Sequence, residues 1–333
     1  MTDPDGLRHD ALFYDDDRGY LDAITGFVAQ GRAAGEPVLV AVPADRLARV
    51  GPTLGAADGV TLADMSALGR NPAAIIPAVL RDFVHRHSGR RSWIVGESLW
   101  PGRPAATYRH CAEHEAMINL ALGSYPLTVL CLFDRDRLPA EALADARRTH
   151  PVVRGGAGTG PSVDYQPPEQ VLAGCAAPLS PPPGHAATMP VTAAGLGALR
   201  AAVAADAHAA GLPADRTDDL RIVITELATN AISHAGGPAT ARWWLTAGAL
   251  ACEVSAAGGP ADPLAGRIPA AATAERGRGL LLVHQLCDLV DVGSAGGTTT
   301  VRVHLALPPV SIPAPRSAAG ATERGFAPGA FPL

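Results

Sequence analysis

A stretch rich in glycine and proline divides the chain into two segments whose apolar residues follow different patterns. Residues 8–150 alternate short apolar runs with helix-like segments, whereas residues 190–307 begin with helix-like segments and continue with strand-like ones. Residues 151–189 show no sustained period, so we interpret them as a linker. The tail 308–333 has a similar composition, and we expect it to be disordered. A chain of 333 residues is long enough for two hydrophobic cores.

The apolar runs of the first segment are continuous and rich in Val, Ile or Leu, which is typical of strands buried on both faces. They are Pro37–Pro43, Val60–Ala63, Ser92–Gly96 and Leu127–Phe133. Helical stripes separate these runs, and one of them follows Asn71-Pro72, a pair that suits a helix N-terminus. The repeated order of strand and helix predicts an α/β domain with a parallel sheet and right-handed crossovers.

The second segment predicts helices packed on an antiparallel sheet, an α+β sandwich. The expected helices carry Leu196 to Ala207, span about 216–235, and span 279–286. The expected strands are 241–246 and 250–255, followed by a hairpin of 288–293 and 299–305.

Composition excludes several functional classes. The sequence contains no lysine, so all 27 basic residues are arginine. This excludes a Walker A phosphate loop, a Schiff-base lysine and a lysine general base. A net charge of -5 gives no electrostatic reason to expect a nucleic acid or an anionic membrane as a partner.

The five cysteines are scattered and form no C-x-x-C pair, so their spacing supports neither a disulfide framework nor a zinc site. The N-terminus is polar, and no apolar run approaches the ~20 residues that span a bilayer. We therefore expect a cytoplasmic protein whose cysteines are buried as small apolar residues.

Three polar residues share one side of the helix expected at 216–235. Glu226, Asn230 and His234 stand four residues apart, so they project in the same direction. An amide oxygen is a hard ligand suitable for Mg²⁺, and a carboxylate can accept a proton. The pattern indicates a metal-assisted site, although a solvated helix face would show the same residues.

Glycines suitable for phosphate binding follow later in the chain. Gly277-Arg278-Gly279 opens the expected helix at 279–286, where free backbone amides and the helix dipole favour an anion. Arg276 and Arg278 add positive charge. Thr298 and Thr299, beside the hairpin glycines, can supply a hydroxyl. Each feature alone also fits a flexible loop or a plain turn, so the inference depends on their order and spacing.

These segments together resemble the GHKL ATPase fold and, more narrowly, the anti-sigma factor serine kinases of bacteria. The matching boxes, within about residues 190–307, are ELATNAISHA (226–235), Gly258-Gly259, RGRGLLLV (276–283) and GGTTTVRVHL (296–305). The resemblance implies that Asn230 ligates Mg²⁺, that Glu226 acts as general base, and that the glycines of the second box form an ATP lid. It implies a nucleotide site formed by Asn230, His234, Gly258, Arg276, Gly277, Arg278, Gly279, Leu280, Thr298 and Thr299.

The same resemblance implies ATP and Mg²⁺ as cofactors, and a sigma factor and a STAS-type anti-anti-sigma protein as partners. A serine of the latter would accept the phosphoryl group. Homodimers are plausible for such a family, although nothing in this sequence demonstrates one.

One position departs from the family pattern. The family's first glycine box carries an aspartate, D-x-G, that hydrogen-bonds the adenine amino group, and here that position is Ala256. Asp262 would replace it only if the loop folds back. The alternative is therefore a catalytically degenerate switch that binds partners without binding ATP well. A histidine kinase is disfavoured, because no helix with a phosphoacceptor histidine precedes Leu196 and His185 lies in the linker.

The first segment resembles the MEDS sensory domain, a RecA-like α/β module often fused to such kinases. The matching stretches are HDALFY (9–14), AGEPVLVAVP (34–43), ADMSALGRNPAAIIP (63–77), WPGRPAATYRHCAEHEAMIN (100–119) and VLCLFD (129–134). The family is proposed to sense small molecules, which implies an unidentified small-molecule signal here.

Ligands of open parallel sheets bind beyond the carboxyl ends of the strands. Asp64, Glu97 and Asp134 each follow an expected strand, so they can share one rim with Trp100. Glu97 is either a pocket residue or the acceptor of a structural hydrogen bond. His114, a further pocket candidate, lies one helical turn after His110 and beside Glu115. We interpret the two histidines as core or surface residues rather than metal ligands.

Overall fold

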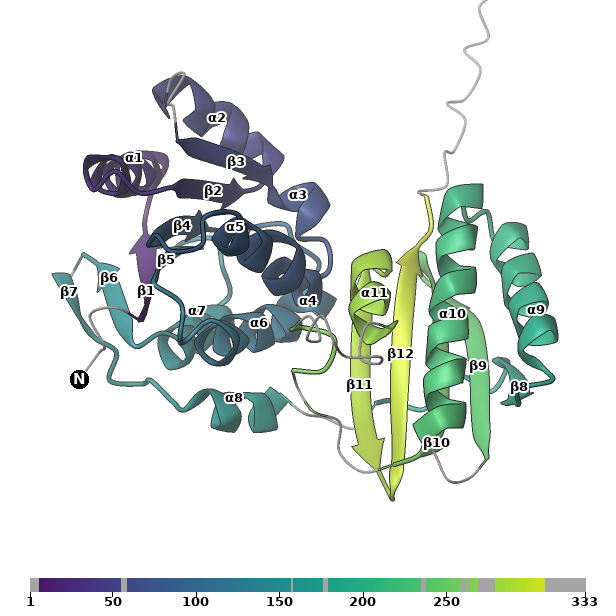
Figure 1. Ribbon diagram of the computed structural model, residues 1–333. Coiled ribbons are helices and arrows are strands. Elements are labelled where there is room, and N and C mark those ends of the chain that lie inside the picture. Colours follow the sequence, from purple (N-terminus) through teal and green to yellow (C-terminus); the bar gives the residue numbers. More distant parts are fainter. Residues whose placement is uncertain are drawn as a thin grey trace, which may run out of the picture.

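The computed structural model describes residues 6–54, 59–156, 158–175, 179–234, 238–258, 262, 264–268 and 279–308. The described residues form two domains that lie side by side (Figure 1). Each domain contains its own sheet, as the change of pattern along the sequence predicts. Among these residues we find no helix with both the length and the apolar character needed to cross a bilayer.

The first domain is built on a sheet that, over the described residues, has the strand order β3-β2-β4-β5-β1-β6-β7. Its strands are β1 (Leu7–Tyr14), β2 (Val38–Val42), β3 (Val60–Asp64), β4 (Ser92–Gly96), β5 (Leu127–Asp134), β6 (Val152–Gly155) and β7 (Gly158–Pro161). Strands β1 to β6 run parallel to their neighbours, and β7 adds an antiparallel edge. The predicted parallel α/β sheet is confirmed.

Helices cover both faces of this sheet. They are α1 (Asp17–Ala33), α2 (Ala44–Leu54), α3 (Met65–Leu68), α4 (Pro72–Ile75), α5 (Arg81–Arg86), α6 (Tyr108–Ala121), α7 (Ala140–Thr149) and α8 (Pro168–Cys175), with a π-turn at Ile76–Leu80 and a 3-10 turn at Ala105–Thr107. The Asn71 side chain caps α4 by accepting a hydrogen bond from the Ala73 amide at 3.0 Å. Pro72 occupies the first helical position, where a missing amide hydrogen costs nothing.

Alternation along the buried strand β5 divides its side chains between two cores. Val129, Cys131 and Phe133 face α4 to α8, whereas Leu130 and Leu132 face α1 and α2. All eight residues of β5 are buried, which explains why the sequence of this strand is mostly apolar.

Residues 151–189 contain more regular structure than their composition predicts. β6 pairs with β1 and extends the first sheet, and α8 buries Val171, Leu172 and Cys175 in the first core. A further strand, β8 (Ala187–Val191), pairs with the second sheet. Glycine and proline punctuate these elements closely, so each one is too short to give a periodic signal of its own.

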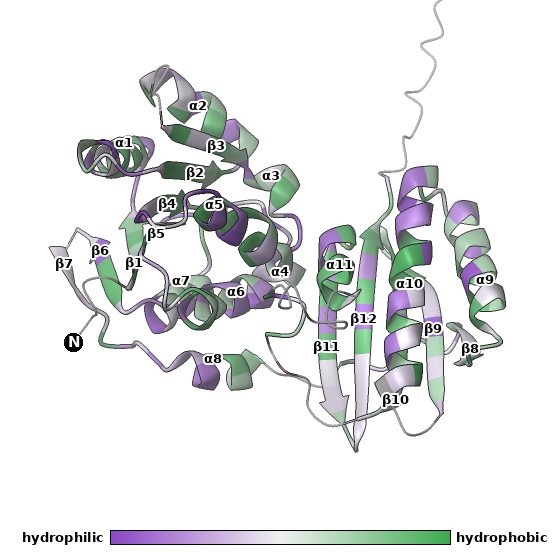
Figure 2. Ribbon diagram, viewed as in Figure 1, coloured by the Kyte–Doolittle hydropathy of each residue, from purple (hydrophilic) through white to green (hydrophobic). Residues whose placement is uncertain are grey.

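The second domain is an antiparallel sheet with the order β11-β12-β10-β9-β8 in the described part of the chain. Its other strands are β9 (Ala239–Thr246), β10 (Ala249–Ala257), β11 (Leu289–Ala295) and β12 (Thr298–Ala306). The helices α9 (Leu196–Ala209), α10 (Ala214–His234) and α11 (Gly279–Leu286) pack on it. Hydrophilic and hydrophobic residues alternate along α10 (Figure 2). This arrangement confirms the predicted α+β sandwich.

Candidate functional site

The helix α10 buries one side and leaves Glu226 and Asn230 on an adjoining, half-exposed side. The buried side consists of Leu220, Val223, Leu227 and Ala231, all within the core of the second domain. Because these apolar residues recur at helical spacing, the packing of α10 fixes the direction of the two polar side chains. The carboxylate and the carboxamide therefore lie one helical turn apart, on one side.

The start of α11 lies directly against this pair. A methyl group added to Gly279 would overlap Glu226 Oε2, and its carbon would lie 3.6 Å from Asn230 Nδ2. Only a residue without a Cβ permits this approach. The first and second predicted boxes, 49 to 53 residues apart in the sequence, thus meet in space. Leu280 follows Gly279 and packs against the second core, which anchors the start of α11.

The remaining predicted residues gather at the ends of β10 and β12. The Gly258 amide donates a hydrogen bond to the Gly297 carbonyl at 3.0 Å. A Cβ on Gly258 would lie 3.3 Å from Thr299 Oγ1, and Thr298 pairs with Ala257. The strand β9, which follows α10, begins beside the same end of β10, because Ala239 pairs with Ala256. These residues therefore share one end of the sheet with the C-terminal end of α10.

The position expected to recognise adenine offers no polar group. Ala256 packs against the second core. Asp262 takes part in a local turn, in which its Oδ1 accepts a hydrogen bond from the Leu264 amide at 2.9 Å. Arg276, Gly277, Arg278 and the side chain of His234 lie outside the described residues.

An open groove of about 550 Å³ between α9 and α10 reaches Glu226 from the other side. Its lining consists of Gly197, Arg200, Ala201, Arg221, Ile222, Thr225 and Glu226. The lining does not include Gly279, so the groove gives access to Glu226 apart from its contact with α11.

Comparison with known families agrees with this division of the chain. The family model for MEDS, described as the MEthanogen/methylotroph, DcmR Sensory domain, matches residues 8–151. The model for the histidine kinase-like ATPase domain matches residues 189–305. The chain joins a MEDS domain to a histidine-kinase-like ATPase domain.

No curated protein matches the chain significantly. One similar solved structure is the crystal structure of the RsbU and RsbW domains of Rv1364c from Mycobacterium tuberculosis, which is 17% identical with a TM-score of 0.29. The match covers 38% of this chain and 33% of that chain, so this chain spans about a third of that structure.

Within the MEDS domain, Glu97 directly follows strand β4 and Asp134 is the last residue of the adjacent strand β5, and both have Arg46 as a neighbour. The hydroxyls of Tyr14 and Tyr20 donate to the Glu97 carboxylate at 3.2 and 3.1 Å. Arg46 lies 3.8 Å from Asp134 Oδ2 and is itself buried. Burial raises the pKa of Glu97 to about 7. The two tyrosine hydrogen bonds favour the structural alternative for Glu97, and Arg46 and the tyrosines are residues that the sequence did not single out.

The other residues expected in a sensory pocket make separate contacts. Asp64 caps α3 by accepting from the Ser66 amide at 2.8 Å. The Arg103 guanidinium stacks over Trp100, 4.3 Å from the ring centroid. His114 is buried on α6, where burial lowers its pKa to about 4. The contacts of Asp64, Trp100 and His114 thus do not include Glu97 or Asp134.

Proposed function

We propose that the chain is a signal-responsive cytoplasmic regulator of the anti-sigma type. Its ATPase domain transfers the γ-phosphoryl group of ATP to a serine of a STAS-type anti-anti-sigma protein, and this exchange controls a sigma factor. The observation that carries the proposal is the convergence of Glu226, Asn230 and Gly279, three residues of two separate boxes, where α10 meets the start of α11. A small-molecule signal acts through the MEDS domain.

Asn230, Gly279 and Glu226 have different roles in the proposed phosphoryl transfer. Asn230 would hold Mg²⁺ through its amide oxygen, and backbone amides at Gly279, at the N-terminus of α11, would donate hydrogen bonds to phosphate oxygens. Bound Mg²⁺ would neutralise negative charge on the phosphates. Glu226 is half-exposed and directed to the same place, so it can take the proton of the serine hydroxyl.

The groove between α9 and α10 supports docking of a protein acceptor near Glu226. Arg200 and Arg221 border it and favour an acidic surface. Ile222, which is 44% exposed, adds an apolar contact. A serine presented along this groove would approach the Glu226 carboxylate from the side opposite to Gly279.

The MEDS domain contacts the ATPase domain next to its nucleotide site. Asn71 Nδ2 donates to the His284 carbonyl of α11 at 2.7 Å, and Arg109 pairs with Asp291 of β11 at 2.6 Å. Arg267, which lies between β10 and α11, pairs with Glu113 of α6 at 3.2 Å. A change in α6 would therefore reach both β11 and the segment that precedes α11.

A phosphotransfer assay with the full chain tests the proposal. The protein is incubated with labelled ATP, Mg²⁺ and each STAS-type protein encoded near its gene. We expect serine phosphorylation that falls about 10²- to 10⁴-fold in Glu226→Gln, because a general base is lost. Thr229→Ala, an exposed residue of the same helix, is the control. Failure to phosphorylate or bind any such partner overturns the proposal, and equal rates in the two variants overturn the role of Glu226.

A second candidate is a partner-binding switch without catalysis. Ala256 favours it, because its methyl side chain packs against the second core and offers no acceptor to adenine. Calorimetric titration of the full chain with an ATP analogue and Mg²⁺ separates the two candidates. Absent nucleotide binding, together with undiminished partner binding by Glu226→Ala, would favour the switch.

A further inference from the structure

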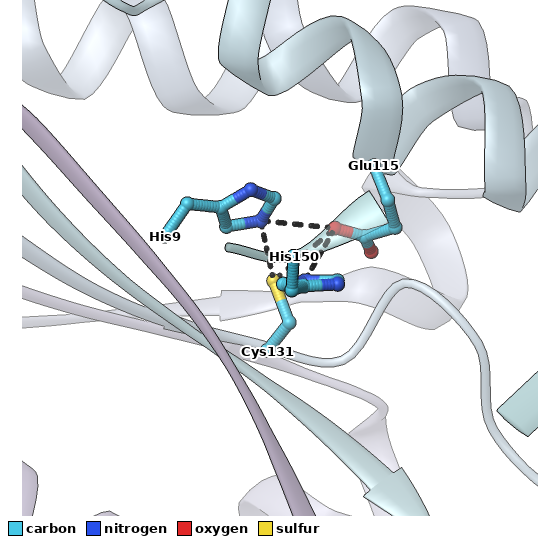
Figure 3. A group of neighbouring side chains, drawn as sticks. All are labelled: His9, Glu115, Cys131 and His150. Carbon is cyan, nitrogen blue, oxygen red and sulfur yellow. Dashed lines mark hydrogen bonds and ion pairs between the residues drawn. The ribbon is translucent and has the colours of Figure 1, made fainter. Parts of the chain in front are cut away.

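Four buried side chains of the MEDS domain converge on one point, although they come from four different elements (Figure 3). They are His9 of β1, Glu115 of α6, Cys131 of β5 and His150, directly after α7. In the β1–β5 pairing Ala11 lies beside Cys131, and His9 is two residues before Ala11. His9 and Cys131 therefore point from the same face of the sheet toward α6 and α7.

The distances among their ligand atoms match those of a small coordination polyhedron. Glu115 Oε2 lies 3.3 Å from His9 Nε2, 3.5 Å from His150 Nε2 and 3.2 Å from Cys131 Sγ. His9 Nε2 lies 3.4 Å from Cys131 Sγ, and no pair in the group is separated by more than 4.8 Å. Bonds of about 2.0–2.3 Å to a tetrahedral Zn²⁺ would give edges of about 3.3–3.7 Å.

The second nitrogen of His9 fixes which tautomer this histidine adopts. Asn119 Nδ2 donates to the Thr149 carbonyl at 2.8 Å, which leaves Asn119 Oδ1 as an acceptor. His9 Nδ1 lies 3.1 Å from that oxygen and therefore carries the hydrogen. The lone pair of neutral His9 is then on Nε2, which faces Glu115 and Cys131.

His150 is held in the same tautomer. Its Nδ1 lies 2.7 Å from the Ala146 carbonyl, which can only accept a hydrogen bond. The Nε2 atom has no hydrogen-bond partner, although His150 is completely buried. An unpartnered acceptor at such depth costs free energy unless a cation occupies the space that it faces.

From these contacts we infer that His9, Glu115, Cys131 and His150 form a binding site for one Zn²⁺ ion. Two imidazoles, a thiolate and a carboxylate are a donor set that Zn²⁺ accepts in tetrahedral geometry. Hydrogen bonds from the far nitrogens to Asn119 and Ala146 are the outer contacts that orient metal-binding histidines. Ser98 Oγ donates to the other carboxylate oxygen, Glu115 Oε1, and leaves Oε2 for the metal.

A narrow cavity reaches the site from the side of Glu115. It is lined by Ser98, Leu99, Tyr108, Cys111, Ala112, Glu115, Phe133, Ala142, Asp145, Ala146 and Thr149. The lining is mostly apolar and lies between α6 and α7, and the cavity has a volume of about 10 Å³, roughly the space of one water molecule.

The proposed zinc site is also connected to the ATPase domain through α6. The ligand Glu115 is two residues from Glu113, which contacts Arg267 of the other domain. Binding of Zn²⁺ would fix α6 relative to β1 and β5, and the same helix carries the contacts between domains. One of the four proposed ligands therefore belongs to a helix that also contacts the ATPase domain.

Metal binding is tested on the full chain after removal of bound ions with a chelator. We expect uptake of one Zn²⁺ per chain by elemental analysis, and a rise in melting temperature upon Zn²⁺ addition. Co²⁺ used as a probe should give a thiolate-to-cobalt charge-transfer band and the visible bands of tetrahedral cobalt. Wild-type protein that binds no Zn²⁺, or that binds Co²⁺ without a thiolate band, overturns the proposal whatever the variants do.

Substitutions of single residues test which side chains bind the metal. Cys131→Ser should abolish the charge-transfer band, whereas Cys175→Ser, another buried cysteine of the same domain, should keep it. Asn119→Ala should keep the band but weaken Zn²⁺ binding about 10- to 100-fold, because only an outer contact is lost. Equal bands in the two cysteine variants would overturn the assignment of the thiolate. Circular dichroism of the chelator-treated variants identifies any that fail to fold.

Discussion

Gly279 and Glu226 approach so closely that a methyl group on Gly279 would overlap the Glu226 carboxylate. We expect Gly279→Ala to displace this carboxylate and to slow serine phosphorylation about 100-fold, since a shift of about 1 Å has that effect on a catalytic group. Gly26→Ala on α1 is the control, because a Cβ there meets no atom within 4 Å. Unchanged phosphorylation by Gly279→Ala, with normal melting temperatures, would show that Glu226 needs no such fixed position.

Ala256→Asp should restore recognition of adenine. A hydrogen bond to a charged group contributes ~1.5–3 kcal/mol, so we expect the affinity for ATP to rise about 10- to 150-fold. Ala257→Asp adds the same charge at an exposed neighbouring position and serves as the control. Calorimetric titration of both variants measures the change. Equal affinities of the two variants for ATP would mean that the added negative charge acts by general electrostatic attraction or repulsion and not by a contact with the adenine base.

Elements with a strong local signal could be predicted from the sequence, sometimes to the residue. The run Ser92–Gly96 is strand β4, and Gly279–Leu286 is helix α11. The central strand β1 gave no continuous apolar run, because it carries His9 and Asp10, which are nevertheless buried. The folded chain satisfies these polar groups through distant partners: Asp10 accepts from Arg154, and His9 contacts Asn119.

The two candidate sites differ in the same way in how far the sequence predicts them. Glu226 and Asn230 lie on one helix, so their spacing alone indicated a shared direction. The ligands His9, Cys131 and His150 lie on separate elements, and no spacing rule connects residues that only the sheet topology brings together. The pair His110 and His114 illustrates the limit further: one lies at the contact between the domains, while the other is in the core.

Domain contact should weaken as pH rises, because of His110. Its Nδ1 lies 3.2 Å from Glu113 and its Nε2 lies 3.0 Å from Asp291. Burial alone would lower the pKa of His110, but these hydrogen bonds raise it above the ordinary 6.5. The stabilisation is therefore fully present below about pH 6.5 and is lost as pH rises through the raised pKa.

Asp291 keeps its charge over that range. Burial alone would raise the pKa of Asp291, but hydrogen bonds from His110 and His304 outweigh burial and lower it. Small-angle scattering of the full chain between about pH 6 and pH 9 should show a larger radius of gyration at the higher value. His110→Gln should remove this dependence, and His208→Gln, on the exposed side of α9, should retain it. The same pH dependence in both variants would exclude His110 as its source.

Arg267→Ala should release the segment before α11 from the MEDS domain. The Arg267 side chain is 7% exposed and pairs with Glu113, while Leu264 and Ile268 of the same segment pack against the MEDS core. Since Glu113 keeps His110 and Arg109 as partners, we expect a loss of about 1–2 kcal/mol, or about 5- to 30-fold faster amide exchange over 264–268.

Hydrogen–deuterium exchange followed by mass spectrometry measures this release on the full chain. Arg18→Ala removes an exposed pair with Asp22 and should leave exchange over 264–268 unchanged, because exposed ion pairs contribute little. If the contact also restrains the nucleotide site, the Arg267→Ala protein should respond less to addition or removal of Zn²⁺ in the phosphotransfer assay. Wild-type exchange rates in Arg267→Ala would mean that the apolar contacts of Leu264 and Ile268 hold the segment without the ion pair.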